Sequence, residues 1–216
     1  LPNDAPHLLE RLAAEQPGQR IQTSVRQALQ RQTQALVNRY AREYSSNHIH
    51  NLAAIVADVE TGEVLAYAGN ATYPADERQG NQVDIITSPR STGSILKPFL
   101  YAGMLHDGLL LPSMLVSDVP LNINGFSPHN YNKTFYGAVP AHVAIERSLN
   151  VPLVRMLSQY NTGRFMSLLK SWGMTTLRFS EEHYGASLIL GGAEGTLWDL
   201  SGMYASMSRV LKHYRT

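Results

Sequence analysis

Two short apolar runs in the first third of the chain constrain its possible folds more than any other feature of the sequence. Leu52–Val59 and Val64–Ala68 are joined by a polar turn that contains Gly62. Short apolar runs joined by a glycine-containing turn predict a β-hairpin. Both alternating sets of the first run are apolar (Ala53, Ile55 and Ala57; Ala54 and Val56), which predicts a sheet covered on both sides.

Most other patterns along the chain are helical. A helix is expected from Thr23, capped by Thr23 or Ser24, with an apolar face of Val25, Leu29, Leu36, Tyr40 and Tyr44. Further helices are expected over 93–106, 141–147, 153–160, 164–172 and from 197 onward, the last capped by Thr196. Residues 69–90 and 109–137 are expected to be irregular. One hairpin followed by many helices predicts an α+β fold.

Composition excludes several classes of function. The chain has 216 residues, a formal net charge of +1 and no cysteine. The balanced charge argues against nucleic acid as a partner, and the missing cysteines exclude disulfides and thiol catalysis. No apolar run of about 18 residues occurs, and the first residues lack the pattern of a signal peptide. Residues 1–22 are rich in Pro, Gln and Glu, and are expected to be a linker or extended arm inside a longer chain.

The run Ser94–Lys97 is the first candidate for chemistry. A serine and a lysine at positions i and i+3 share a helix face, and a lysine with a lowered pKa can take the serine proton. Gly93 permits a sharp turn into the helix, and Pro98 places the serine near the helix start. The free N–H groups there favour a developing oxyanion.

Such pairs also occur by chance, so each motif has a competing interpretation. A second pair, Ser167 and Lys170, lies in an amphipathic segment and is expected on the surface. The segment Ser148–Asn150 can present a hydroxyl that relays a proton and an amide that holds a carbonyl and the lysine. The similar segment Ser45–Asn47 is expected only to end a helix.

Taken together, these segments resemble class A penicillin-binding proteins over nearly the whole chain. The resemblance rests on Arg90–Leu100, Ala54–Gly69, Pro128–Tyr131, Ser148–Pro152 and Leu190–Glu194. It implies a penicillin-binding protein/β-lactamase-like α+β fold: an antiparallel sheet with flanking helices and a helical subdomain. It also implies that residues 23–216 are the N-terminal part of a transpeptidase domain.

The resemblance further implies a reaction. Ser94 would attack the D-Ala-D-Ala carbonyl of a peptidoglycan stem peptide, and an amine of a second stem would then resolve the acyl-enzyme. Lys97 would be the base, Ser148 a proton relay and Asn150 an anchor for substrate and lysine, while β-lactams would acylate the same serine. The family also implies a periplasmic location at the inner membrane, an upstream anchor and an upstream glycosyltransferase domain. No cofactor or metal is expected.

One family motif is missing from the chain. No Lys-Thr-Gly or Lys-Ser-Gly follows Asn150. The pair Lys133-Thr134 is not this motif, because it is followed by Phe135 and precedes Ser148. We therefore expect a chain that is incomplete on its C-terminal side, and impaired if it acts alone.

Other features leave alternatives open. Asn130 and Tyr131 are candidates for lining the substrate cleft, whereas His48 and His50 are expected to be loop residues and no metal ligands. A DD-carboxypeptidase or β-lactamase, and a β-lactam-sensing module without catalysis, remain rival functions.

Overall fold

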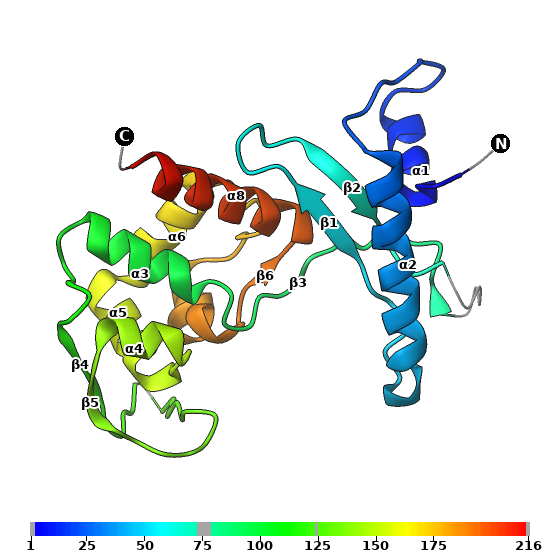
Figure 1. Cartoon of the computed structure of the whole chain (residues 1–216). Coiled ribbons are helices and arrows are strands. Elements are labelled where there is room, and N and C mark those ends of the chain that lie inside the picture. The colour runs from blue at the N-terminus through cyan, green and yellow to red at the C-terminus, as the bar shows by residue number, and fades with distance from the viewer. Residues whose placement is uncertain (1–2, 73–78, 124, 215–216) are drawn as a thin grey trace. The chain divides into compact units, whose positions relative to one another are not determined.

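The computed structural model describes residues 3–72, 79–123 and 125–214, and it has an α+β fold of helices with small antiparallel sheets (Figure 1). It divides into two compact units, residues 1–89 with 196–216, and residues 90–195. In the part of the chain that is described, no helix is both long and apolar enough to cross a bilayer.

The first unit is built on the predicted hairpin. Strands β1 (Ala54–Ala57) and β2 (Val64–Ala68) pair antiparallel, with Ala54 opposite Ala68. Helix α2 (Gln27–Glu43) packs Val37 and Ala41 against Ala68 and Ala54.

The opposite face of the hairpin is also covered. Tyr67 neighbours Ala68 in β2 and therefore points to the other face, where its ring lies 6.4 Å from that of Trp198. Trp198 belongs to α8 (Leu197–His213), whose cap is confirmed because Asp199 N donates to Thr196 Oγ1 at 2.9 Å. The prediction of a sheet covered on both sides is therefore confirmed.

The predicted start and apolar face of α2 were wrong. The helix is preceded by Arg26 without a side-chain cap, and Ser24 Oγ donates instead to Val64 O at 2.8 Å. Its buried residues are Gln30, Thr33, Val37 and Ala41, whereas Leu36 is 51% exposed. The reason is Gln30, whose amide bonds both the N–H and the C=O of Tyr67 in β2, at 2.7 and 2.9 Å.

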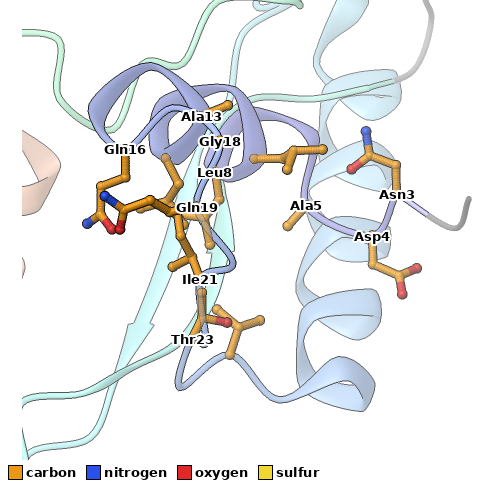
Figure 2. A pocket seen from close by; sticks show the side chains of 13 residues that line it. Asn3, Asp4, Ala5, Leu8, Ala13, Gln16, Gly18, Gln19, Ile21 and Thr23 are labelled. Atoms are coloured by element: carbon orange, nitrogen blue, oxygen red, sulfur yellow. The ribbon is translucent and has the colours of Figure 1, made fainter.

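Residues 6–15 form a helix where an extended arm was expected. Helix α1 (Pro6–Glu15) starts with proline, which suits a first helical turn, and buries His7, whose Nε2 lies 2.8 Å from Asn81 O. A short 3-10 helix, η1 (Ser45–Asn47), follows α2, as expected for a segment that ends a helix. A pocket of about 380 Å³ lies between α1 and the segment that follows it. Its lining mixes apolar side chains such as Leu8 and Ile21 with polar ones such as Gln16 and Gln19 (Figure 2).

The second unit holds every segment of the predicted chemistry. Its elements are β3 (Arg90–Ser91), α3 (Lys97–His106), β4 (Leu115–Asp118), β5 (Gly137–Pro140), α4 (Ala141–Glu146), α5 (Asn150–Tyr160), α6 (Thr162–Ser171), α7 (Glu181–Tyr184), the 3-10 helix η3 (Gly185–Leu190) and β6 (Glu194–Gly195). Strand β3 pairs with β6, and β4 with β5, both antiparallel. The core includes Phe99, Leu153, Met156, Phe165 and Leu169.

Two predictions for this unit need correction. Residues 109–137 were expected to be irregular, but β4 lies within this stretch and β5 begins at its last residue. In β4, Leu115 and Ser117 are exposed while Val116 and Asp118 are buried, so the two faces do not divide into apolar and polar residues. Helix α3 begins at Lys97, later than the predicted Gly93.

Candidate active site

Ser94 lies on a tight turn directly before α3. Ile95 N donates to Thr92 O, and Lys97 N donates to Ser94 O, both at 3.1 Å, so the chain turns twice before the helix begins. Gly93 has a φ of +53°, a backbone conformation that glycine adopts without steric cost. Ser94 is exposed, and its hydroxyl makes no hydrogen bond with the described residues.

The short sheet of β3 and β6, with the residues next to it, holds the turn that carries Ser94. Ser91 Oγ donates to Gly191 O at 2.8 Å, and the backbone N and side-chain Oγ1 of Thr92 donate to Ala193 O at 3.0 and 3.1 Å. A Cβ on Gly191 would lie 2.8 Å from Gly93 Cα, and Gly191 has a φ of +101°. Gly191 belongs to the segment Leu190–Glu194 that carries the family resemblance, and its close approach to Gly93 was not predicted.

Lys97 is the buried centre of the site. It is 1% exposed, and its Nζ donates to Ser148 O at 2.7 Å, Ser148 Oγ at 3.2 Å and Asn150 Oδ1 at 2.7 Å. These partners carry no charge, and none of the ion pairs found among the described residues includes Lys97. Burial therefore lowers the pKa of Lys97 from 10.5 to about 8.

Ser148 faces Lys97 because the link between α4 and α5 is sharply bent. Its φ is +51°, in the left-handed region that residues other than glycine rarely adopt. Leu149 N then donates to Ala144 O at 2.9 Å, which closes the turn. The conformation places both the carbonyl and the hydroxyl of Ser148 within reach of Nζ.

Asn150 is the first residue of α5, and its side chain is oriented at both ends. Nδ2 donates to His129 O at 2.8 Å, so Oδ1 is the atom that faces Lys97. Asn130 is 2% exposed, and its amide bonds to Asp118, Thr134 and Asn150, whereas the Tyr131 side chain is fully exposed. Their contact with a substrate stays a prediction, and for Asn130 it would require breaking these bonds.

The structure brings together three of the four residues predicted for catalysis. Lys97, Ser148 and Asn150 are joined by hydrogen bonds, and Ser94 lies three residues earlier on the exposed turn before α3. The predicted contact between Ser94 Oγ and Lys97 Nζ is not a hydrogen bond here.

The competing motifs have the environments expected of them. Ser167 and Lys170 are both exposed on α6, and Ser167 Oγ donates to Gly163 O of its own helix. His48 and His50 form an edge-on ring pair with centroids 6.4 Å apart.

The protonation state of Lys97 decides what the cluster can do. As an ammonium, Nζ has three protons for its three acceptors. As a neutral amine it keeps two donors for the shorter bonds, and its lone pair can then accept a proton from a hydroxyl. A pKa near 8 makes both states accessible close to neutral pH.

Comparison with known proteins gives a consistent set of relatives. The penicillin binding protein transpeptidase domain model matches residues 52–196. Penicillin-binding protein 1C of Escherichia coli (strain K12) is 32% identical over 209 residues, which cover 97% of this chain and 27% of that protein. Penicillin-binding protein 1A of Pseudomonas aeruginosa is 28% identical over 71% of this chain and 18% of its own length.

Solved structures agree on the fold. Penicillin-binding protein 3 from Mycobacterium tuberculosis superposes with a TM-score of 0.70 at 23% identity, covering 86% of this chain and 46% of that one. PonA1 from the same organism, in complex with penicillin V, gives 0.66 at 19% identity, covering 93% of this chain and 55% of that one. The chain spans about a quarter or less of the curated relatives cited here, and it belongs to the penicillin-binding protein transpeptidase family.

Proposed function

We propose that this chain carries the nucleophile of a serine DD-transpeptidase that cross-links peptidoglycan stem peptides and is acylated by β-lactams. The observation that carries the proposal is the buried Lys97 amine, bonded to Ser148 and Asn150 and placed one turn after the exposed Ser94. Family membership supplies the class of substrate, and the complex of PonA1 with penicillin V supports the class of inhibitor.

In the proposed first half-reaction, Ser94 Oγ attacks the carbonyl carbon between the two D-Ala residues. Its proton passes to neutral Lys97 as the C–O bond forms. The C–N bond then breaks, and the departing D-Ala amine takes a proton, relayed through the Ser148 hydroxyl from the Lys97 ammonium.

In the second half-reaction, the amine of another stem peptide attacks the Ser94 ester. The C–N bond of the new amide forms, the C–O bond to Ser94 breaks, and the proton lost by the attacking amine passes to Ser94 Oγ. A β-lactam would acylate Ser94 in the same way, but its leaving nitrogen stays tethered to the adduct. Asn150, held by Lys97 and His129, would anchor both the lysine and the substrate amide.

The cellular setting is part of the proposal. We place the domain at the periplasmic face of the inner membrane, behind an upstream anchor and glycosyltransferase domain, as in class A relatives. Stem peptides are its proposed partners, as donor and as amine acceptor, and no nucleic acid is expected from its charge of +1.

Labelling with a fluorescent penicillin tests the proposal on the complete natural protein. The unaltered protein should form a stable covalent adduct on the peptide that contains Ser94, found by mass spectrometry. Ser94→Ala should abolish the label, while Ser167→Ala, the matched change at the exposed Ser-x-x-Lys motif, should keep it.

Three results would overturn the proposal. A label that survives Ser94→Ala, or no label on the unaltered protein, would exclude Ser94 as the acylated nucleophile. Rapid release of the opened β-lactam would indicate a β-lactamase or carboxypeptidase type of hydrolase in place of a transpeptidase.

A further inference from the structure

The side chain of Asn130 joins three segments of the second unit below the candidate site. Its Oδ1 accepts from the backbone N of Asn150 at 2.9 Å and of Val151 at 3.3 Å. Its Nδ2 lies 2.9 and 3.0 Å from the two carboxyl oxygens of Asp118, and donates to Thr134 O at 2.8 Å. One amide thus connects the end of β4, the loop before β5 and the start of α5.

Asp118 is an unusual partner for this amide. It is 0% exposed, and none of the ion pairs found among the described residues includes it. Its other contact is Tyr136 N, which donates to Oδ2 at 3.0 Å. A buried carboxyl group is costly unless its oxygens are bonded, and here two of its three bonds go to Asn130.

His129 and Asn130, which are neighbours in the sequence, hold Asn150 at two different atoms. Asn130 Oδ1 holds its backbone N, and His129 O holds its side-chain Nδ2. Because Nδ2 is occupied there, Oδ1 is left to accept from Lys97 Nζ at 2.7 Å. A continuous path of hydrogen bonds therefore runs from Asp118 through Asn130 and Asn150 to the lysine.

We infer that Asp118 and Asn130 are positioning residues for this reaction, a clamp that sets Asn150 and through it the reactive amine of Lys97. The inference rests on the proposed function, since its consequence is the rate of Ser94 acylation. The hydrogen bonds of Lys97 Nζ go to Ser148 and Asn150, so the clamp acts on the lysine through Asn150.

The first test is Asn130→Ala in the complete natural protein, measured by the rate of fluorescent penicillin acylation. We expect acylation to slow on the order of 10- to 100-fold, the usual result of small misplacements of catalytic groups. Asn132→Ala is the matched control. Asn132 lies in the same loop, but among the described residues it bonds Thr134 and Tyr136 alone, so acylation should stay within about twofold. Equal slowing by both variants would overturn the inference.

A double-variant cycle separates positioning from a general structural role. If Asn130 acts through Asn150, then Asn130→Ala combined with Asn150→Ala should be no slower than Asn150→Ala alone. Slowing factors that multiply would show independent action and overturn the inference.

A second pair of variants keeps the test valid if Asn130→Ala folds poorly. Asp118→Asn keeps the side-chain shape but sets an amide against the Asn130 amide, so acylation should slow several-fold. The swap Asp118→Asn with Asn130→Asp restores one donor and one acceptor between the positions, and should recover part of the loss. A swap slower than Asp118→Asn would contradict the clamp.

Failure of the clamp and failure of the proposed function give different results. If the unaltered protein is not labelled at Ser94, the proposed function fails. If it is labelled at Ser94 but Asn130→Ala reacts as fast, only the clamp fails.

Discussion

At the scale of single residues, burial separates a reactive lysine from an ordinary one. The chain contains the Ser-x-x-Lys spacing twice, at Ser94–Lys97 and Ser167–Lys170. Lys170 is exposed, whereas Lys97 is 1% exposed with only uncharged partners. Desolvation disfavours the ammonium form, so the same residue type becomes a possible base at one site alone.

The pKa of Lys97 predicts how β-lactam acylation depends on pH. Below about 8 the lysine is an ammonium and cannot accept the Ser94 proton; above that value it is neutral. The acylation rate should therefore fall roughly tenfold per pH unit below pH 8 and level off above it. Stopped-flow labelling from pH 6 to 9.5 checks this. A rate that is flat, or that declines as pH rises through 8, would exclude neutral Lys97 as the base.

The left-handed backbone of Ser148 predicts a separation of stability from chemistry. Glycine at a φ of +51° relieves a strain that alanine keeps, so Ser148→Gly should be about 1 kcal/mol more stable than Ser148→Ala. Both variants lack the hydroxyl next to Nζ, so both should slow acylation. Denaturant unfolding and labelling rates measure the two effects. Equal stability of the variants would contradict the strain.

At the scale of elements, the two-residue strands β3 and β6 fix the position of the turn that carries Ser94. Arg90 pairs with Gly195 and Ser91 with Glu194. The chain then passes so close to Gly191 that a single added carbon there would meet the Gly93 backbone. These strands therefore matter for position far more than for the sheet they form.

Gly191→Ala tests this close approach, with Gly173→Ala as its control. The φ values are similar, +101° and +108°, but a Cβ at Gly173 meets no atom within 4 Å. Both variants put an alanine at a similar positive φ, but only Gly191→Ala adds a clash, so it should cost about 2 kcal/mol more and slow acylation on the order of 10-fold. Thermal unfolding and labelling compare them. Indistinguishable variants would mean that the turn adjusts freely.

Local sequence patterns predict the helices and strands of this chain well, but they do not predict the contacts between distant segments. The hairpin, α6, α8 and the Thr196 cap of α8 follow from apolar spacing and capping residues, and all four occur. Strand β4 was missed because it buries Asp118, a residue that weakens any strand pattern. The buried face of α2 was misplaced for a similar reason, since Gln30 is buried by bonds to a strand far along the chain.

The candidate site divides in the same way. Ser94, Lys97, Ser148 and Asn150 are visible as short motifs. Asn130 was also predicted, but as a residue that lines the substrate cleft. The contacts of Asp118, Asn130 and Gly191 join segments that are distant in the sequence, and no local spacing encodes them.

At the scale of the whole molecule, the chain leaves the first unit after Pro89 and returns at Thr196. These two crossings adjoin β3 and β6, which are paired with each other. All residues of the candidate site lie between the crossings, and the two tryptophans of the chain fall one in each unit.

We predict that the two units unfold locally and independently of each other, and one tryptophan in each unit offers a test. Trp198 lies against Tyr67 and under the Arg11 guanidinium, 4.7 Å from the ring centroid, while Trp172 lies 5.7 Å from Phe99. Trp198→Ala should lower the free energy of local opening of β2 and α8 by about 2 kcal/mol. It should leave the opening free energy of α5 unchanged. Trp172→Ala should do the same to α3 and α6 and leave β2 unchanged.

Hydrogen exchange followed by mass spectrometry measures both variants in one experiment. Each variant is the control for the other, because each removes one indole from one unit. If either change speeds exchange equally in β2 and α5, the two units unfold as one cooperative body, and the nucleophile turn depends on the stability of the hairpin. If the effects stay separate, residues 90–195 keep the geometry of Lys97 through their own contacts, and changes in the first unit should leave the acylation rate unchanged.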